Sequence, residues 1–337
     1  MEVPTRPSID ISGRWTTAWA SRKSLKTFTI AALFAVAFSL FLLSGKQRTI
    51  GQANGCDFPA IFNFGDSNSD KGGKSAAFHR IPLPNGNSFF QKPAGRCCNG
   101  KVIIDFIGVN SDIKRKLPRP EDFSQALYIF EVGQNDLDGA FKSMTEKQVV
   151  ESIPGIISQF AQAVKRLHQQ GAGTFWIHNT GPIGCLPFQV LEYPPQTDNV
   201  DQNGCIRSRN EVAQEFNRQL KERVIQLRMQ FPDAAMTYVD IYSAKYSLIS
   251  DAKKHGFANA LRYCCGHYRD NLCWRKKVVN GTEILGTSCR NTSAYISWDG
   301  IHYSHAANLW VANKVLDGLL SDPPTPITEA CLMPLHL

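Results

Sequence analysis

The sequence predicts an α/β fold, in which a doubly wound, mostly parallel sheet is flanked by helices in three layers. After Cys56, short β-rich apolar runs alternate with longer stretches of helical period, as expected when helices connect parallel strands. No internal repeat or low-complexity segment interrupts this alternation. The 337 residues are 43% hydrophobic and 20% charged, which is ordinary globular composition and fits one sizeable domain.

Four apolar runs are the predicted strands, and each is followed by a loop and a helix. They are residues 60–64, 126–130, 174–178 and 236–241. Short runs rich in β-branched and aromatic residues are typical of strands buried on both faces. In such sheets ligands bind beyond the carboxyl ends of the strands, so the residues that follow each run are the first candidates for a site.

Three helices are predicted with defined starts or faces. Residues 145–170 carry Pro154 near the first turns, where a missing amide is least harmful or a kink results. A last helix begins near Ser304, a good N-cap, and continues to Leu320. The helix at 206–231 has a buried face at spacings of three and four, made by Val212, Phe216, Leu220, Val224, Leu227 and Phe231.

Residues 1–55 are interpreted as an export signal, and residues 56–337 as the folded domain. A basic stretch leads into the apolar run 28–43, which is shorter than the roughly 20 residues of a membrane-spanning helix. Small residues just after this run predict cleavage near Ala53 and a secreted, extracellular product. The alternative is a signal anchor, in which residues 28–43 hold the protein at a membrane.

The charge distribution argues against nucleic acid as a partner. The formal net charge is +8, but the first 55 residues carry seven Lys and Arg against two Asp and Glu. The rest of the chain holds 30 basic against 27 acidic residues, so the folded part is nearly neutral.

All ten cysteines lie at or beyond Cys56, and an even number in an exported chain predicts disulfides. Within the long loop 252–297, we expect one or two disulfides among four cysteines, and a further one between Cys185 and Cys205. A zinc site is disfavoured because two well-spaced Cys-x-x-Cys pairs and clustered histidines are missing. The four loop cysteines are Cys264, Cys265, Cys273 and Cys289.

Two glycosylation sequons fall in the same polar region. Asn280-Gly281-Thr282 and Asn291-Thr292-Ser293 predict glycosylated asparagines on a surface loop of an exported chain.

The first predicted strand runs into Gly65-Asp66-Ser67-Asn68-Ser69-Asp70, which makes Ser67 a candidate nucleophile. At a strand-to-helix turn, amides of the helix start can help to stabilise an oxyanion. The alternative is that Ser67 or Ser69 only caps a helix, which is the commoner role of a serine after a strand.

The second strand is followed by Val132-Gly133-Gln134-Asn135-Asp136, which brings an amide side chain to the same edge. Asn135 can donate a hydrogen bond to an oxyanion, although an asparagine here can equally be a turn residue that bonds its own backbone.

Near the C-terminus, Asp299 and His302 lie three residues apart just before the last helix. The carboxylate can hold the imidazole in the useful tautomer while the other ring nitrogen takes the proton of Ser67. The alternatives are an exposed histidine paired with a carboxylate, or His305 as the base.

Together these blocks resemble the plant GDSL esterase/lipase family, within the SGNH hydrolases. The resemblance covers nearly everything from Cys56 to Cys331, and it is strongest to secreted members, some of which carry an α-L-fucosidase label. The blocks are residues 65–70, 133–136, 181–187 and 299–302.

The resemblance implies a serine ester hydrolase that works without cofactor or metal. Ser67 would be the nucleophile, His302 the general base and Asp299 the residue that orients His302. The Asn135 side chain and the Ser67 amide would donate to the oxyanion. The substrate would be an acyl ester of a lipid or an acetylated carbohydrate, cleaved through an acyl-enzyme.

The sequence departs from the family in one large respect and one small one. The family has several dozen more residues where the short joint 110–116 stands, including a strand, its helix and a glycine that gives a third oxyanion amide. One lost oxyanion donor typically costs about 10² to 10³ in turnover. The family also lacks the pair Cys97-Cys98, which either pairs elsewhere or stays free.

Two further hypotheses remain open. A secreted glycoprotein that only binds acyl or carbohydrate ligands is favoured by the missing block. Glycoside hydrolysis needs two carboxylates roughly 5 to 9.5 Å apart, and the sequence pairs none of Asp66, Asp70 and Asp299 for that work.

Overall fold

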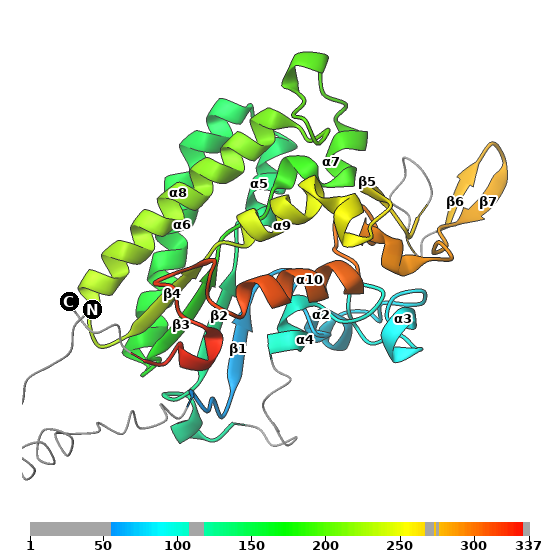
Figure 1. The fold of residues 1–337 in the computed structure, drawn as a ribbon. Coiled ribbons are helices and arrows are strands. Elements are labelled where there is room, and N and C mark those ends of the chain that lie inside the picture. Colours follow the sequence, from blue (N-terminus) through cyan, green and yellow to red (C-terminus); the bar gives the residue numbers. More distant parts are fainter. Residues whose placement is uncertain (1–54, 108–117, 267–272, 274–275, 333–337) are drawn as a thin grey trace, which may run out of the picture. The chain divides into compact units, whose positions relative to one another are not determined.

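The computed structural model describes residues 55–107, 118–266, 273 and 276–332 (Figure 1). The predicted export signal, with its apolar run 28–43 and the cleavage site near Ala53, lies outside the described residues. So does the short joint 110–116.

A five-stranded sheet in the order β1-β2-β3-β4-β9 lies at the centre. The first four strands are parallel, in a register that places Leu127 beside Ile61 and Thr174, and Thr174 beside Ala235. The short β9 runs antiparallel to β4. The predicted mostly parallel α/β sheet is therefore confirmed. The strands are β1 (Ile61–Phe64), β2 (Leu127–Glu131), β3 (Thr174–His178), β4 (Ala235–Val239) and β9 (Ser321–Asp322).

Helices cover both faces of this sheet. The long helices α6 (Glu146–Gln169) and α8 (Arg207–Gln230) pack against each other on one side. On the other side, α10 (His305–Val315) packs against α4 (Ile103–Ile107) and α9 (Ile241–Ser250), as Figure 1 shows. The remaining helices are α2 (Gly73–Ala77), α3 (Asn87–Phe90), α5 (Gln134–Phe141) and α7 (Pro187–Glu192).

The two long helices follow the predicted spacing closely. Thr145 caps α6, where its hydroxyl accepts from the amide of Gln148 and the Gln148 side chain accepts from the amide of Thr145. Pro154 lies inside α6 rather than in its first turn. In α8, five of the six predicted core residues are buried: Val212, Phe216, Leu220, Val224 and Leu227.

Two predicted ends were wrong. The fourth strand stops at Val239 because the carboxylate of Asp240 accepts from the amide of Ser243 and so caps α9. The last helix ends at Val315, since Gly318 has a φ of +80° and the chain turns there into β9.

The stretch 252–297, predicted as a stapled loop, also contains four strands. They form two small two-stranded sheets, β5 with β8 and β6 with β7. The staples are Cys264–Cys289 and Cys265–Cys273, and Cys185–Cys205 is also formed, so these disulfide predictions are confirmed. The strands are β5 (Asn259–Tyr263), β6 (Lys276–Val279), β7 (Thr282–Leu285) and β8 (Tyr295–Ser297).

A fourth disulfide, Cys56–Cys331, joins the two ends of the described domain, which the sequence analysis did not pair. Cys97 and Cys98 are free and buried, and burial raises the pKa of both thiols to about 12. Among the described residues, no helix is both long and apolar enough to cross a bilayer.

Candidate active site

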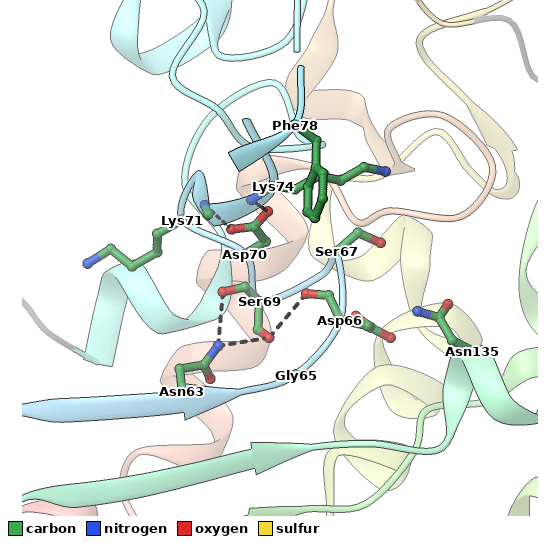
Figure 2. Close-up of a pocket in the computed structure, with 11 residues that line it drawn as sticks. Asn63, Gly65, Asp66, Ser67, Ser69, Asp70, Lys71, Lys74, Phe78 and Asn135 are labelled. Carbon is green, nitrogen blue, oxygen red and sulfur yellow. Dashed lines mark hydrogen bonds between the residues drawn. The ribbon is translucent and has the colours of Figure 1, made fainter. Parts of the chain in front are cut away.

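Polar side chains from three parts of the chain gather at the carboxyl edge of the sheet. Ser67 lies in a turn three residues after the end of β1, Asn135 lies in the first turn of α5 after β2, and the loop before α10 carries Asp299 and His302. Figure 2 shows Ser67 and Asn135 facing the same cavity.

The serine, histidine and aspartate form one continuous chain of hydrogen bonds. The hydroxyl Oγ of Ser67 lies 2.7 Å from Nε2 of His302, and Nδ1 of His302 lies 2.6 Å from Oδ2 of Asp299. This is the order in which a histidine takes a proton from a serine while a carboxylate holds its ring. Residues 235 positions apart are thus within proton-transfer distance.

The Asp299 carboxylate is held by the backbone of its own loop. Its Oδ1 accepts from the amides of Ile301 and His302 at 3.0 and 2.9 Å, which leaves Oδ2 for the imidazole. Asp299 is 3% exposed and His302 is 9% exposed, so water competes little for this pair.

The loop that carries Asp299 is fixed from behind by the disulfide-stapled segment. The carbonyl of Trp298 accepts from the amides of Cys264 and Cys265, and the Trp298 indole donates to Asn85 at 2.9 Å. Trp298 itself is 1% exposed and packs with the cystines of this segment. The two staples therefore help to hold the imidazole in place.

The pH dependence follows from the surroundings of His302. Burial lowers the pKa of His302, but the charge and hydrogen bond of Asp299 outweigh burial, so this pKa lies above the ordinary 6.5. A general base must be neutral, and a raised pKa keeps the ring protonated to higher pH. We therefore expect kcat/KM for an uncharged ester to fall on acidification with a midpoint above pH 6.5.

The control for this pH profile is His305→Gln, which removes the neighbouring histidine and should leave the midpoint in place. A midpoint below 6.5, or one that moves in this variant, would contradict the assignment of the acid limb to His302.

Two amide groups at the cavity of Ser67 are candidate donors for an oxyanion. Within the described residues, neither the backbone amide of Ser67 nor the side-chain amide of Asn135 has a hydrogen-bond acceptor. Asn135 is exposed at the start of α5 and does not bond its own backbone, so the turn-residue alternative was wrong. Both amides are free to bind a developing negative charge.

At two positions near Ser67 and Asn135, the backbone comes so close to neighbouring side chains that only glycine fits. A Cβ at Gly65 would collide with the Ser69 hydroxyl and lie 3.3 Å from Glu131. Gly133 is the N-cap of α5 and has a φ of +109°, which favours glycine. A Cβ at this position would lie 2.6 Å from the ring of Phe216.

The expectation that the serine turn leads directly into a helix was wrong, and so were the alternatives of a capping serine and of His305 as the base. Ser67 does not begin a helix, because α2 starts only at Gly73, and neither Ser67 nor Ser69 caps it. The Ser69 hydroxyl instead accepts from the side-chain amide of Asn63. His305 is not placed as the base, since its Nδ1 accepts from the amide of Lys101.

A buried group of charged residues lies beneath the site, and the sequence analysis missed it. Lys245 of α9 is 2% exposed, and its ammonium lies 3.5 Å from the carboxylate of Glu131, the last residue of β2. Burial and the charge of Glu131 raise the pKa of Asp66, while Lys245 opposes this shift. Burial, with Lys245 in support, lowers the pKa of His178 to about 3.

The cavity above Ser67 has a volume of about 630 Å³. Its walls combine polar, charged and aromatic side chains from β1, the turn that follows it, α2 with its C-cap, and α5. They include Asn63, Asp70, Lys71, Lys74, Phe78 and Asn135 (Figure 2). For metals, the described residues offer one group of closely spaced ligands, Cys185, Asp201 and Cys205, but its two sulfurs are joined in a disulfide.

The similarity to known proteins is extensive. Residues 61–315 match the family model for GDSL-like lipase/acylhydrolase. A GDSL esterase/lipase of Arabidopsis thaliana is 43% identical over 350 residues, covering 82% of this chain and 90% of its own. One of Zea mays is 40% identical, covering 85% and 92%. A protein named alpha-L-fucosidase 3, from Arabidopsis thaliana, is 38% identical, covering 84% and 96%. The chain therefore belongs to the GDSL-like lipase/acylhydrolase family and is a carboxylic ester hydrolase of the GDSL type.

Proposed function

We propose that this protein cleaves acyl esters through an acyl-enzyme on Ser67, with His302 as general base and Asp299 as the residue that orients it. The observation that carries the proposal is the hydrogen-bond chain from Ser67 Oγ through the imidazole to Asp299, at the wall of an open cavity.

In the first half-reaction, Oγ of Ser67 attacks the ester carbonyl as Nε2 of His302 takes the hydroxyl proton. The carbonyl oxygen becomes an oxyanion that accepts from the Ser67 amide and the Asn135 side chain. The C–O bond to the alcohol then breaks, and the alcohol leaves with the proton from His302. Water repeats the sequence and releases the acid.

The substrates we propose are acyl esters of lipid or of acetylated carbohydrate. A cavity of about 630 Å³ has room for such a group, and its mixture of polar and apolar walls suits an ester. We further propose that the protein is exported and glycosylated. Four disulfides among the described residues favour an oxidising compartment, and Asn280 and Asn291 are both exposed.

The shortened joint bears on the efficiency of this reaction. The alignment with the first Arabidopsis relative is 350 residues long but uses only 82% of a 337-residue chain, so that relative has positions without a counterpart here. Among the described strands, β1 pairs with β2 alone. Loss of the glycine block remains a prediction, and with it turnover would rest on two oxyanion donors.

Labelling by a fluorophosphonate probe tests the proposal. These probes phosphonylate a serine that a histidine activates, so we expect one adduct on the intact protein, and mass spectrometry should place it on the peptide with Ser67. The same preparation should release nitrophenol from a short-chain para-nitrophenyl ester. A heat-unfolded sample is the control for non-specific labelling.

The alternative of a protein that only binds its ligand predicts neither adduct nor nitrophenol release. An adduct on another serine would contradict the assignment of Ser67. The name alpha-L-fucosidase 3 of one relative brings glycoside hydrolysis into consideration, but Asp299 is engaged by His302 and Asp70 accepts from three backbone amides. These bonds favour ester chemistry.

A further inference from the structure

We propose that Lys74 and Phe78 form a subsite for esters that also carry a carboxylate, with the Lys74 ammonium binding the carboxylate and the Phe78 ring packing against the carbon skeleton. The inference rests on the proposed function, because it names the substrate class of the same cavity.

Both side chains come from one short helix at the cavity. Lys74 lies in α2 and Phe78 is its C-cap, four residues later, so they share one side of the helix. Both line the cavity that contains Ser67. In Figure 2 they lie together on one side of Ser67, and Asn135 lies on the other. A substrate with its carbonyl oxygen at Asn135 would extend past Ser67 toward this pair.

Lys74 is the lysine of this cavity whose charge is not engaged. Its ammonium has no ion-pair partner among the residues that the structure describes, whereas Lys71 lies 3.6 Å from Asp105, a carboxylate also bound by Arg96. The carboxylate of Asp70 accepts from the amides that start α2, including that of Lys74 itself, rather than from the ammonium.

The remaining acidic group of the cavity wall does little to neutralise Lys74. Burial and the nearby charge of Glu131 raise the pKa of Asp66, which makes its ionised form less favourable. Lys74 lies near the reacting centre, since it lines the same cavity as Ser67 and its positive charge opposes the rise in the pKa of His302. An anion bound at Lys74 is therefore close to the serine and histidine.

Phe78 adds an apolar surface beside this charge. Phe78 as a whole residue is 82% exposed, although burying an aromatic ring is strongly favourable. A ligand that covers the ring would bury this surface. The subsite thus combines one ammonium group, that of Lys74, with one apolar surface, the ring of Phe78. This combination suits a carboxylate with one negative charge on a short carbon chain or an aromatic ring. Phosphate groups are more often held by several donors or by the arginine fork.

Two matched pairs of esters test the proposal. Para-nitrophenyl hemiglutarate and para-nitrophenyl valerate differ by a carboxylate in the acyl half. Para-butyryloxybenzoate and para-butyryloxybenzamide differ by a carboxylate in the alcohol half. For each pair, the ratio of kcat/KM for the anionic ester to that for the neutral ester is measured in the wild type and in Lys74→Met, at the alkaline plateau of the pH profile.

We expect Lys74→Met to lower this ratio about three- to fivefold in one of the pairs, which also tells which half of the ester holds the anion. Added salt should lower the wild-type ratio and have little effect on that of the variant. Because only ratios are compared, differences in leaving-group reactivity cancel.

Two charge controls sharpen the test. Lys165→Met removes an exposed charge on α6, outside the cavity, and should leave both ratios within about twofold. Lys71→Met should act much less than Lys74→Met because Lys71 is engaged with Asp105. Equal losses in Lys71→Met and Lys74→Met, or unchanged ratios in Lys74→Met, would overturn the subsite while ester hydrolysis stands. A wild type that cleaves none of the four esters would overturn the proposed function and the subsite together.

Discussion

The Ser67→Ala variant is expected to hydrolyse a short acyl ester about 10⁶-fold more slowly than the wild type, as far as the background of the assay allows this to be measured. The reason is that the substitution removes the attacking oxygen itself. Once the Oγ that lies 2.7 Å from Nε2 of His302 is gone, no bond can form to the carbonyl carbon. The measurement is kcat in a steady-state assay on protein whose circular dichroism matches that of the wild type.

His302→Ala should lose about as much as Ser67→Ala, and the double variant hardly more, because the two residues act as one unit. Ser69→Ala is the matched control. The hydroxyl of Ser69 accepts from Asn63 and donates to the carbonyl of Asp66, whereas the imidazole bonds to Ser67, so the variant should keep most of the activity. An equal loss in Ser69→Ala, or additive losses in the double variant, would contradict the assignment of Ser67 and His302.

The sequence predicted the sheet and the long helices because local pattern decides them. The strands β1 to β3 and the helices α6 and α8 start and end within one residue of the predicted positions. The fourth strand and the last helix failed where one side-chain cap or one left-handed glycine competes with the pattern. The staples of 252–297 were predicted, but β5 and β8 pair across a distance that no local pattern encodes. The hairpin of β6 and β7 has a local signal that was missed, because Asn280 and Gly281 form its two-residue turn with positive φ at both positions.

The site shows the same division between local and distant information. Asp299 and His302 lie three residues apart, and their hydrogen bond could be predicted from that spacing. The meeting of His302 with Ser67 depends on strand order, and here the resemblance to a known family supplied what periodicity cannot. The role of Trp298, which ties the catalytic loop to two disulfides, and the pairing of Lys245 with Glu131 leave no sequence motif at all.

Lys245→Met is expected to lower the free energy of unfolding by about 3 to 5 kcal/mol, although it leaves a side chain of similar length. The carboxylate of Glu131 would remain buried without the ammonium that now lies 3.5 Å away. Tyr303, whose ring lies 4.8 Å from that ammonium, would lose a cation–π partner. Urea unfolding with the disulfides intact, followed by tryptophan fluorescence, measures the loss.

Neutralising both partners separates a buried unpaired charge from a simple packing defect. Because Glu131→Gln removes the charge that Lys245→Met leaves unpaired, the double variant should recover most of the stability. Lys142→Met breaks an exposed pair with Asp138 and should cost no more than about 1 kcal/mol. If the double variant is as unstable as Lys245→Met, lost packing of Lys245 against Gly181 and Tyr303 accounts for the effect. That result would contradict the expectation that the buried charge pair of Lys245 and Glu131 stabilises the fold.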